Sequence, residues 1–209
     1  MTRTGLGLHG RATSNVVLLV GCVLLPVAAL VGCGGEEPTP PPALPTLPQV
    51  YVGPTLTEGY GMGVDTSGDR TNWVSDRSGY MECRYPSGQD WGAVFVTVGE
   101  PTSQRSPRGR LDCSAYSYLV MELRGAAGGE QVSVGVKTDE DPDNGLEPKH
   151  EAAALTTSWE TVRIPLSTLV REPTYPASRF TRLYVVMELV FEPGTPAETV
   201  LFRNIRFEQ

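Results

Sequence analysis

Hydrophobic and polar residues alternate with a period of two in seven segments of the chain. These segments are 80–85, 91–98, 116–124, 130–137, 159–166, 183–192 and 199–208. A period of two is typical of β-strands, because successive side chains point to opposite faces of a sheet. Clusters of Gly, Pro, Asn and Ser separate the segments, and the nearest helical pattern, at 151–159, is short and rich in Thr. The pattern predicts an all-β domain, a β-sandwich or jelly roll.

The alternation also predicts which side chains face the core. Three apolar sets should do so: Leu119, Met121 and Leu123; Val132, Val134 and Val136; and Leu183, Val185, Met187 and Leu189. The opposite face would carry polar and aromatic side chains: Glu82, Arg84, Tyr118, Glu122, Lys137, Tyr184 and Glu188. Such a face is either solvated or a platform for a ligand.

A different pattern precedes the strands. Residues 16–33 are an apolar run that ends in Leu-Val-Gly-Cys, and the basic residues Arg3 and Arg11 come before it. This arrangement is typical of a secretory signal peptide, and its end resembles the lipobox of bacterial lipoproteins. The resemblance implies cleavage before Cys33 and a lipid on its thiol. An uncleaved membrane helix is less favoured, since the run falls short of about 20 residues.

Residues 34–49 contain six prolines, so they can neither pair as a strand nor continue a helix. As an extended spacer this segment would span on the order of 50 Å. We therefore expect a signal peptide at 1–32, a lipidated cysteine and Pro-rich linker at 33–49, and a β-sandwich domain at 50–209. The protein would be anchored to a membrane by lipid and face away from the cytoplasm, at the cell surface or in the periplasm.

Charge excludes one class of partner. Removal of the signal would leave 15 basic and 24 acidic residues, a net charge of −9. Because an acidic surface without a basic stripe repels polyphosphate, nucleic acid is not an expected partner.

Four segments, 85–99, 111–137, 156–169 and 183–207, resemble bacterial carbohydrate-binding modules with a galactose-binding-like jelly roll. The motifs that carry this resemblance are D-x-S-x-Y-x-x-L from Asp112, W-x-x-V-x-I-P-L from Trp159 and F-R-N-I-R-F from Phe202. The resemblance implies binding of a polysaccharide or oligosaccharide without cleavage. Related jelly rolls share these motifs without known sugar binding, so a structural module that binds a partner protein is the alternative.

In such modules aromatic rings stack on sugars, and polar side chains bind the hydroxyl groups. The polar face listed above supplies both kinds of group. Trp91 shares a face with Phe95, and it is either part of a buried strand or a stacking platform. Trp73, in a polar loop, either stacks on a ligand or plugs one end of the sandwich. We expect Trp159 to pack under the sandwich.

Catalysis has little support in the sequence. The chain contains two histidines, and His9 would be lost with the signal, so we predict no enzyme. A glycoside hydrolase or lyase is the second alternative, with Glu122 and Glu188 facing each other as its two carboxylates.

Two further features of the sequence are candidates for a metal site and for a disulfide. Asp139, Asp141 and Asp143 could hold a structural calcium ion, although an exposed acidic turn is the alternative. We expect no other cofactor. Cys83 and Cys113 would both reach an oxidising compartment, which predicts a disulfide between them. The alternative is two buried free thiols.

Overall fold

The structure of the chain is a computed structural model that describes residues 49–52, 55–68, 73–103, 106–142, 144–169 and 180–209. All of these belong to one unit of the chain, Pro40–Gln209. The predicted signal peptide, Cys33, most of the linker and Asp143 lie outside the described residues. Within them, no helix has the length and apolar character needed to cross a membrane.

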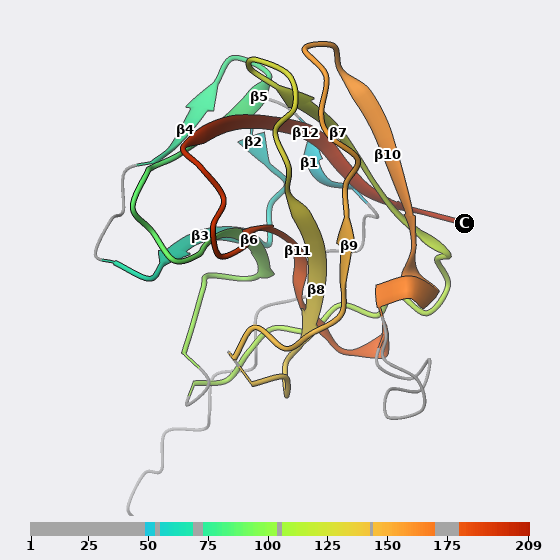
Figure 1. Cartoon of the computed structure of the whole chain (residues 1–209). Coiled ribbons are helices and arrows are strands. Elements are labelled where there is room, and N and C mark those ends of the chain that lie inside the picture. Colours follow the sequence, from blue (N-terminus) through green and yellow to red (C-terminus); the bar gives the residue numbers. More distant parts are fainter. Residues whose placement is uncertain (1–48, 53–54, 69–72, 104–105, 143, 170–179) are drawn as a thin grey trace, which may run out of the picture. The chain divides into compact units, whose positions relative to one another are not determined.

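Two antiparallel sheets form the domain, as predicted (Figure 1). The first sheet has the order β10 (Glu160–Pro165), β7 (Tyr118–Gly125), β12 (Glu198–Glu208), β1 (Gln49–Val52) and β2 (Thr55–Leu56). β5 (Tyr80–Tyr85) also pairs with β12, and β4 (Val74–Arg77) pairs with β5, which makes seven strands.

The second sheet has five strands. Its order is β3 (Tyr60–Thr66), β6 (Gly92–Val98), β11 (Leu183–Phe191), β8 (Ser133–Thr138) and β9 (Lys149–Glu151). A short 3-10 helix, η1 (Leu166–Leu169), follows β10. The described residues contain no α-helix.

The core lies between the two sheets and is built from alternate residues of their strands. The predicted sets on β7 and β8 belong to it, as do Val94, Val96 and Val98 of β6. One prediction on β11 is wrong. The register shifts between Val185 and Met187, and this irregularity turns Val185 away from the core, while Val186 joins Met187 inside.

Trp73 is a core residue that links the two sheets. Its side chain is 5% exposed, and its ring makes edge contacts with Tyr85 of β5 and Phe191 of β11 at centroid distances of 5.8 and 5.5 Å. Tyr85 and Phe191 stack on each other at 4.6 Å. The ligand-stacking prediction for Trp73 is therefore wrong, and its alternative, a plug in the sandwich, is correct.

The predicted disulfide is also wrong. Cys83 and Cys113 are free thiols, and both side chains are fully buried. Cys83 lies on β5 opposite Val200 of β12, whereas Cys113 lies in the loop before β7, where its N–H donates to the carbonyl of Phe180. Burial raises the pKa of both thiols, so they act as small apolar core residues.

Candidate functional site

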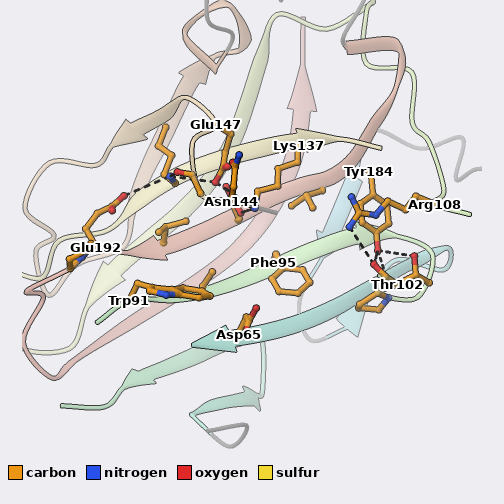
Figure 2. A pocket seen from close by; sticks show the side chains of 18 residues that line it. Asp65, Trp91, Phe95, Thr102, Arg108, Lys137, Asn144, Glu147, Tyr184 and Glu192 are labelled. Carbon is orange, nitrogen blue, oxygen red and sulfur yellow. Dashed lines mark hydrogen bonds and ion pairs between the residues drawn. The ribbon is translucent and has the colours of Figure 1, made fainter. Parts of the chain in front are cut away.

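A cavity of about 600 Å³ opens on the outer face of the five-stranded sheet (Figure 2). All five strands contribute lining residues, among them Asp65 of β3, Phe95 of β6 and Glu188 of β11. The turn before β9 adds Asn144, Gly145 and Glu147. Because Val94 and Val96 point into the core, their neighbour Phe95 points outward into this cavity.

The middle row of this face is flat for a specific reason. Across the sheet, Gly63, Phe95, Glu188, Gly135 and Lys149 lie side by side in register. A Cβ atom on Gly63 would lie 2.3 Å from the ring of Phe95, and one on Gly135 would lie 2.6 Å from Oε1 of Glu188. The two glycines therefore let a ring and a carboxyl group lie down over the sheet.

Trp91 and Phe95 are the aromatic part of the site. Trp91 immediately precedes β6 and is 37% exposed, and it is one of two exposed large hydrophobic side chains among the described residues. Phe95 follows four residues later on the same face (Figure 2). At about 3.3 Å per residue, their Cα atoms lie on the order of 13 Å apart. Of the two interpretations left open for Trp91, the buried strand is therefore wrong, and the stacking platform fits its exposure.

Tyr184 closes the other end of the cavity. Its hydroxyl accepts a hydrogen bond from the backbone N–H of Thr102 at 2.6 Å and donates to the carbonyl of Thr102 at 3.2 Å. The guanidinium of Arg108 lies 4.5 Å from the centre of its ring. Because these contacts leave Tyr184 3% exposed, it forms a wall of the cavity and not a stacking surface.

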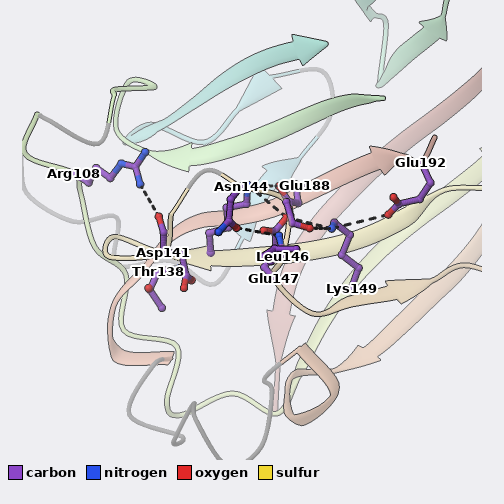
Figure 3. Close-up of polar contacts among 11 residues, drawn as sticks. Arg108, Thr138, Asp141, Asn144, Leu146, Glu147, Lys149, Glu188 and Glu192 are labelled. Atoms are coloured by element: carbon purple, nitrogen blue, oxygen red, sulfur yellow. Dashed lines mark hydrogen bonds and ion pairs between the residues drawn. The ribbon is translucent and has the colours of Figure 1, made fainter. Parts of the chain in front are cut away.

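A charged cluster forms the opposite side of the site (Figure 3). Nζ of Lys137 lies 3.3 Å from Glu188 and 3.5 Å from Glu147. Nζ of Lys149 lies 3.4 Å from Glu147 and 4.0 Å from the more exposed Glu192. These side chains present both donors and acceptors beside the aromatic rings.

The two buried carboxyl groups of this cluster differ in pKa. Burial raises the pKa of Glu188 to about 8, and the charge of Lys137 offsets this effect only in part. Burial also opposes ionisation of Glu147, but its hydrogen bond with Glu188 and the charges of both lysines outweigh that effect. The pKa of Glu147 therefore lies below its ordinary value.

The structure divides the predicted polar face between two sheets. Lys137, Tyr184 and Glu188 lie in the cavity. The other four predicted residues lie on the outer face of the seven-stranded sheet: Glu82, Arg84, Tyr118 and Glu122. The prediction of one shared face is wrong, because alternation shows which way a side chain points within its strand but not which sheet the strand joins.

On the seven-stranded sheet these residues have partners within the chain. Glu82 forms ion pairs with Arg77 at 2.8 Å and Arg84 at 2.6 Å. Glu122 accepts hydrogen bonds from Arg203 at 2.6 Å and Asn204 at 2.8 Å. These bonds lower the pKa of both carboxyl groups, and burial opposes the shift.

Arginines also cover the aromatic rings of that sheet. The guanidinium of Arg163 lies 3.2 Å from the centre of the Tyr118 ring. Those of Arg203 and Arg124 lie 4.2 and 5.2 Å from the ring of Trp159. Trp159 therefore lies on the outer face of the seven-stranded sheet, and the prediction that it packs under the sandwich is wrong.

The geometry contradicts the glycosidase pair, because Glu122 and Glu188 lie on the outer faces of different sheets. The calcium prediction stays a prediction, because Asp143 lies outside the described residues. Among the residues that the structure describes, no group of three or more His, Cys, Asp or Glu side chains could hold a metal ion. Asp139 pairs with Arg110 and Arg182, and Asp141 accepts the backbone N–H of Thr138.

Several residues of the cavity were not predicted as site residues: Asp65, Phe95, Arg108, Glu147, Lys149 and Glu192. Of these residues, only Phe95 could have been found from the sequence, because it lies four positions after Trp91 and therefore points to the same side of the sheet. The glycines at 61 and 63 were a second signal for a close approach on β3, because glycine within a strand often marks such contacts.

Comparisons with known proteins place these features in a family context. The family model "Carbohydrate binding domain 30" matches residues 59–209. No curated protein matches the chain. A crystal structure of a family 30 carbohydrate binding module is 19% identical, with a TM-score of 0.51, and the match covers 77% of this chain and 97% of that one.

Two further solved structures are similar. A second family 30 module is 18% identical with a TM-score of 0.50, over 77% of this chain and 86% of that one. A mutant of a family 29 module complexed with mannohexaose is 15% identical with a TM-score of 0.46, over 77% and 89%. At these identities, the family 30 structures show a shared fold.

Proposed function

Because the chain belongs to the carbohydrate binding domain 30 family, we propose that it binds a linear glycan on the outer face of its five-stranded sheet. The family supports a non-catalytic carbohydrate-binding role for the domain. The location of the site and the shape of its ligand are the parts that we add. One observation carries them: Trp91 and Phe95 lie on one flat, outward face beside a cluster of polar groups.

Stacking explains the aromatic part of the site. A pyranose ring has an apolar C–H face that an aromatic ring can cover, while its hydroxyl groups stay at the edge. Because the Cα atoms of Trp91 and Phe95 lie on the order of 13 Å apart along the strand, the two rings offer stacking surfaces to different sugars of one chain. The ligand is therefore a chain of several sugars that runs along β6.

The polar groups would bind the hydroxyl groups at the edges of that chain. Lys149 and Glu192 line the same cavity as Trp91, and Asp65 lies on β3, the strand next to β6 (Figure 2). Ammonium donors and carboxylate acceptors together can bind sugar hydroxyl groups, which are both donors and acceptors. The sugars bound most tightly are expected to be neutral, because the cluster contains charges of both signs.

A pair of matched variants tests this function. Trp91→Ala should weaken glycan binding by on the order of 1 to 3 kcal/mol, the contribution expected of an aromatic anchor. Trp159→Ala is the control, because Trp159 lies on the outer face of the seven-stranded sheet and does not line the cavity. Both variants are measured by isothermal titration calorimetry with a glycan selected on an array. Equal binding by the two variants would place the site elsewhere, and an array without any bound glycan would favour a protein-binding module.

We propose, in addition, that the domain is held outside the cytoplasm by a lipid on Cys33. The support is the sequence of residues 16–33 and the Pro-rich segment that follows. A spacer on the order of 50 Å would let the domain reach a polysaccharide beyond the membrane surface.

A further inference from the structure

Two carboxyl groups meet on one side of the proposed carbohydrate site. Glu188 comes from β11 and Glu147 from the turn before β9, and their side chains are 2% and 5% exposed. Both contact the same ammonium group, that of Lys137, at 3.3 and 3.5 Å. They also lie within hydrogen-bonding reach of each other.

Two ionised carboxylates would not be stable in this arrangement. Ionised carboxylates accept hydrogen bonds but donate none. Oε1 of Glu188 and Oε2 of Glu147 are buried and find no donor among the described residues. Unpaired buried acceptors and adjacent like charges both destabilise a folded protein. One proton on the pair would supply the missing donor and remove the repulsion.

The surrounding charges also favour one proton. The groups that face the pair are Lys137 from β8, Lys149 from β9 and Glu192 after β11. Asp65 of β3 and Arg108 line the same cavity farther along the sheet. With a proton on the pair, two ammonium groups face two carboxylates, and the cluster is neutral.

We propose that Glu188 and Glu147 share a single proton, and that this hydrogen bond fixes residues 144–148 as one wall of the carbohydrate site. Glu188 is then a positioning residue that acts through Glu147 and not by touching the sugar. Asn144, Gly145 and Glu147 line the cavity, so their placement decides its width. This inference rests on the proposed function for its effect on binding.

Loss of the proton should open the wall. Burial gives Glu188 a pKa of about 8, so the pair loses its proton to solvent above that pH. The two carboxylates then repel each other, and the turn moves away from β11. If only the protonated form binds glycan, affinity is constant below about pH 7 and falls about tenfold for each pH unit above pH 8.

Two variants of the full chain test the effect on binding. Glu188→Gln keeps a neutral donor toward Glu147, so its affinity should match that of the wild type at pH 6 and stay constant to pH 10. Glu140→Gln is the control, because Glu140 is 70% exposed, pairs with Arg182 and does not line the cavity. It should keep the wild-type pH profile. A pH-dependent loss of affinity in Glu188→Gln that equals the wild-type loss would overturn the proposal.

A measurement without any glycan separates this proposal from the proposed function. In the wild-type protein, the carboxyl carbon of Glu188 is followed by 13C NMR during a pH titration. A midpoint near pH 8, with that of Glu147 below 4.5, supports the shared proton, even if no glycan binds and the proposed function fails. Two midpoints near the ordinary value of 4.5 would overturn it.

Discussion

The ring of Phe95 on β6 lies directly over Gly63 on the neighbouring strand β3. A Cβ atom at position 63 would come within 2.3 Å of two ring carbons, closer than any side chain tolerates. The glycine thus holds an aromatic ring flat on the outer face of the sheet. Such a ring presents its face to solvent, which is the orientation that stacking on a sugar requires.

Gly63→Ala should therefore destabilise the protein by about 1 to 3 kcal/mol, the usual effect of overpacking. It should also weaken glycan binding, because the ring of Phe95 must turn. Denaturant unfolding gives the change in stability. In a Phe95→Ala background the same substitution should cost almost nothing, since the clash is gone. Equal costs in both backgrounds would show that the contact between Gly63 and Phe95 is unimportant.

A second prediction concerns the number and the reactivity of the buried thiols. The purified, processed protein should show two reactive thiols per chain in denaturant without reductant, from Cys83 and Cys113. In the folded protein neither should react within minutes with a thiol reagent, because burial raises both pKa values and keeps the thiolate population small. Absence of reactive thiols in denaturant would reveal a disulfide.

A third prediction concerns the proposed lipid on Cys33. Cys33→Ser should release the protein from membranes or leave an unprocessed precursor, because stable anchoring needs more than one acyl chain at the N-terminus. Labelled palmitate should enter the wild-type chain and not the variant. Cys22→Ser, at the other cysteine of the apolar run, is the matched control and should be labelled like the wild type. A wild-type chain that takes up no label would contradict the lipoprotein interpretation.

Alternation along the chain was sufficient to predict every strand of six or more residues except β3. All seven predicted segments contain a strand, from β5 at Tyr80–Tyr85 to β12 at Glu198–Glu208. β3 was not predicted, because Gly61 and Gly63 occupy its outward positions and give no polar signal. β1, β2, β4 and β9 are four residues long or shorter, too short for a periodic pattern.

Less of the candidate site than of the fold could be predicted from the sequence. Alternation placed Glu122 and Glu188 outward correctly, but nothing in either strand shows that β7 and β11 join different sheets. Pairing between strands distant in the chain decides that choice. The charged cluster depends likewise on the turn that brings Glu147 against Lys137. Contacts of this kind arise from tertiary structure and leave no local pattern.

The three described tryptophans allow the most direct test of the carbohydrate site. Trp91 lies in the proposed site, Trp159 on the outer face of the other sheet and Trp73 in the core. Each indole N–H gives its own signal in a 15N NMR spectrum, which can be followed while linear hexasaccharides are added. We expect a bound glycan to shift the signal of Trp91 and to leave those of Trp159 and Trp73 in place. A shift of Trp159 without one of Trp91 would contradict it and move the site to the seven-stranded sheet.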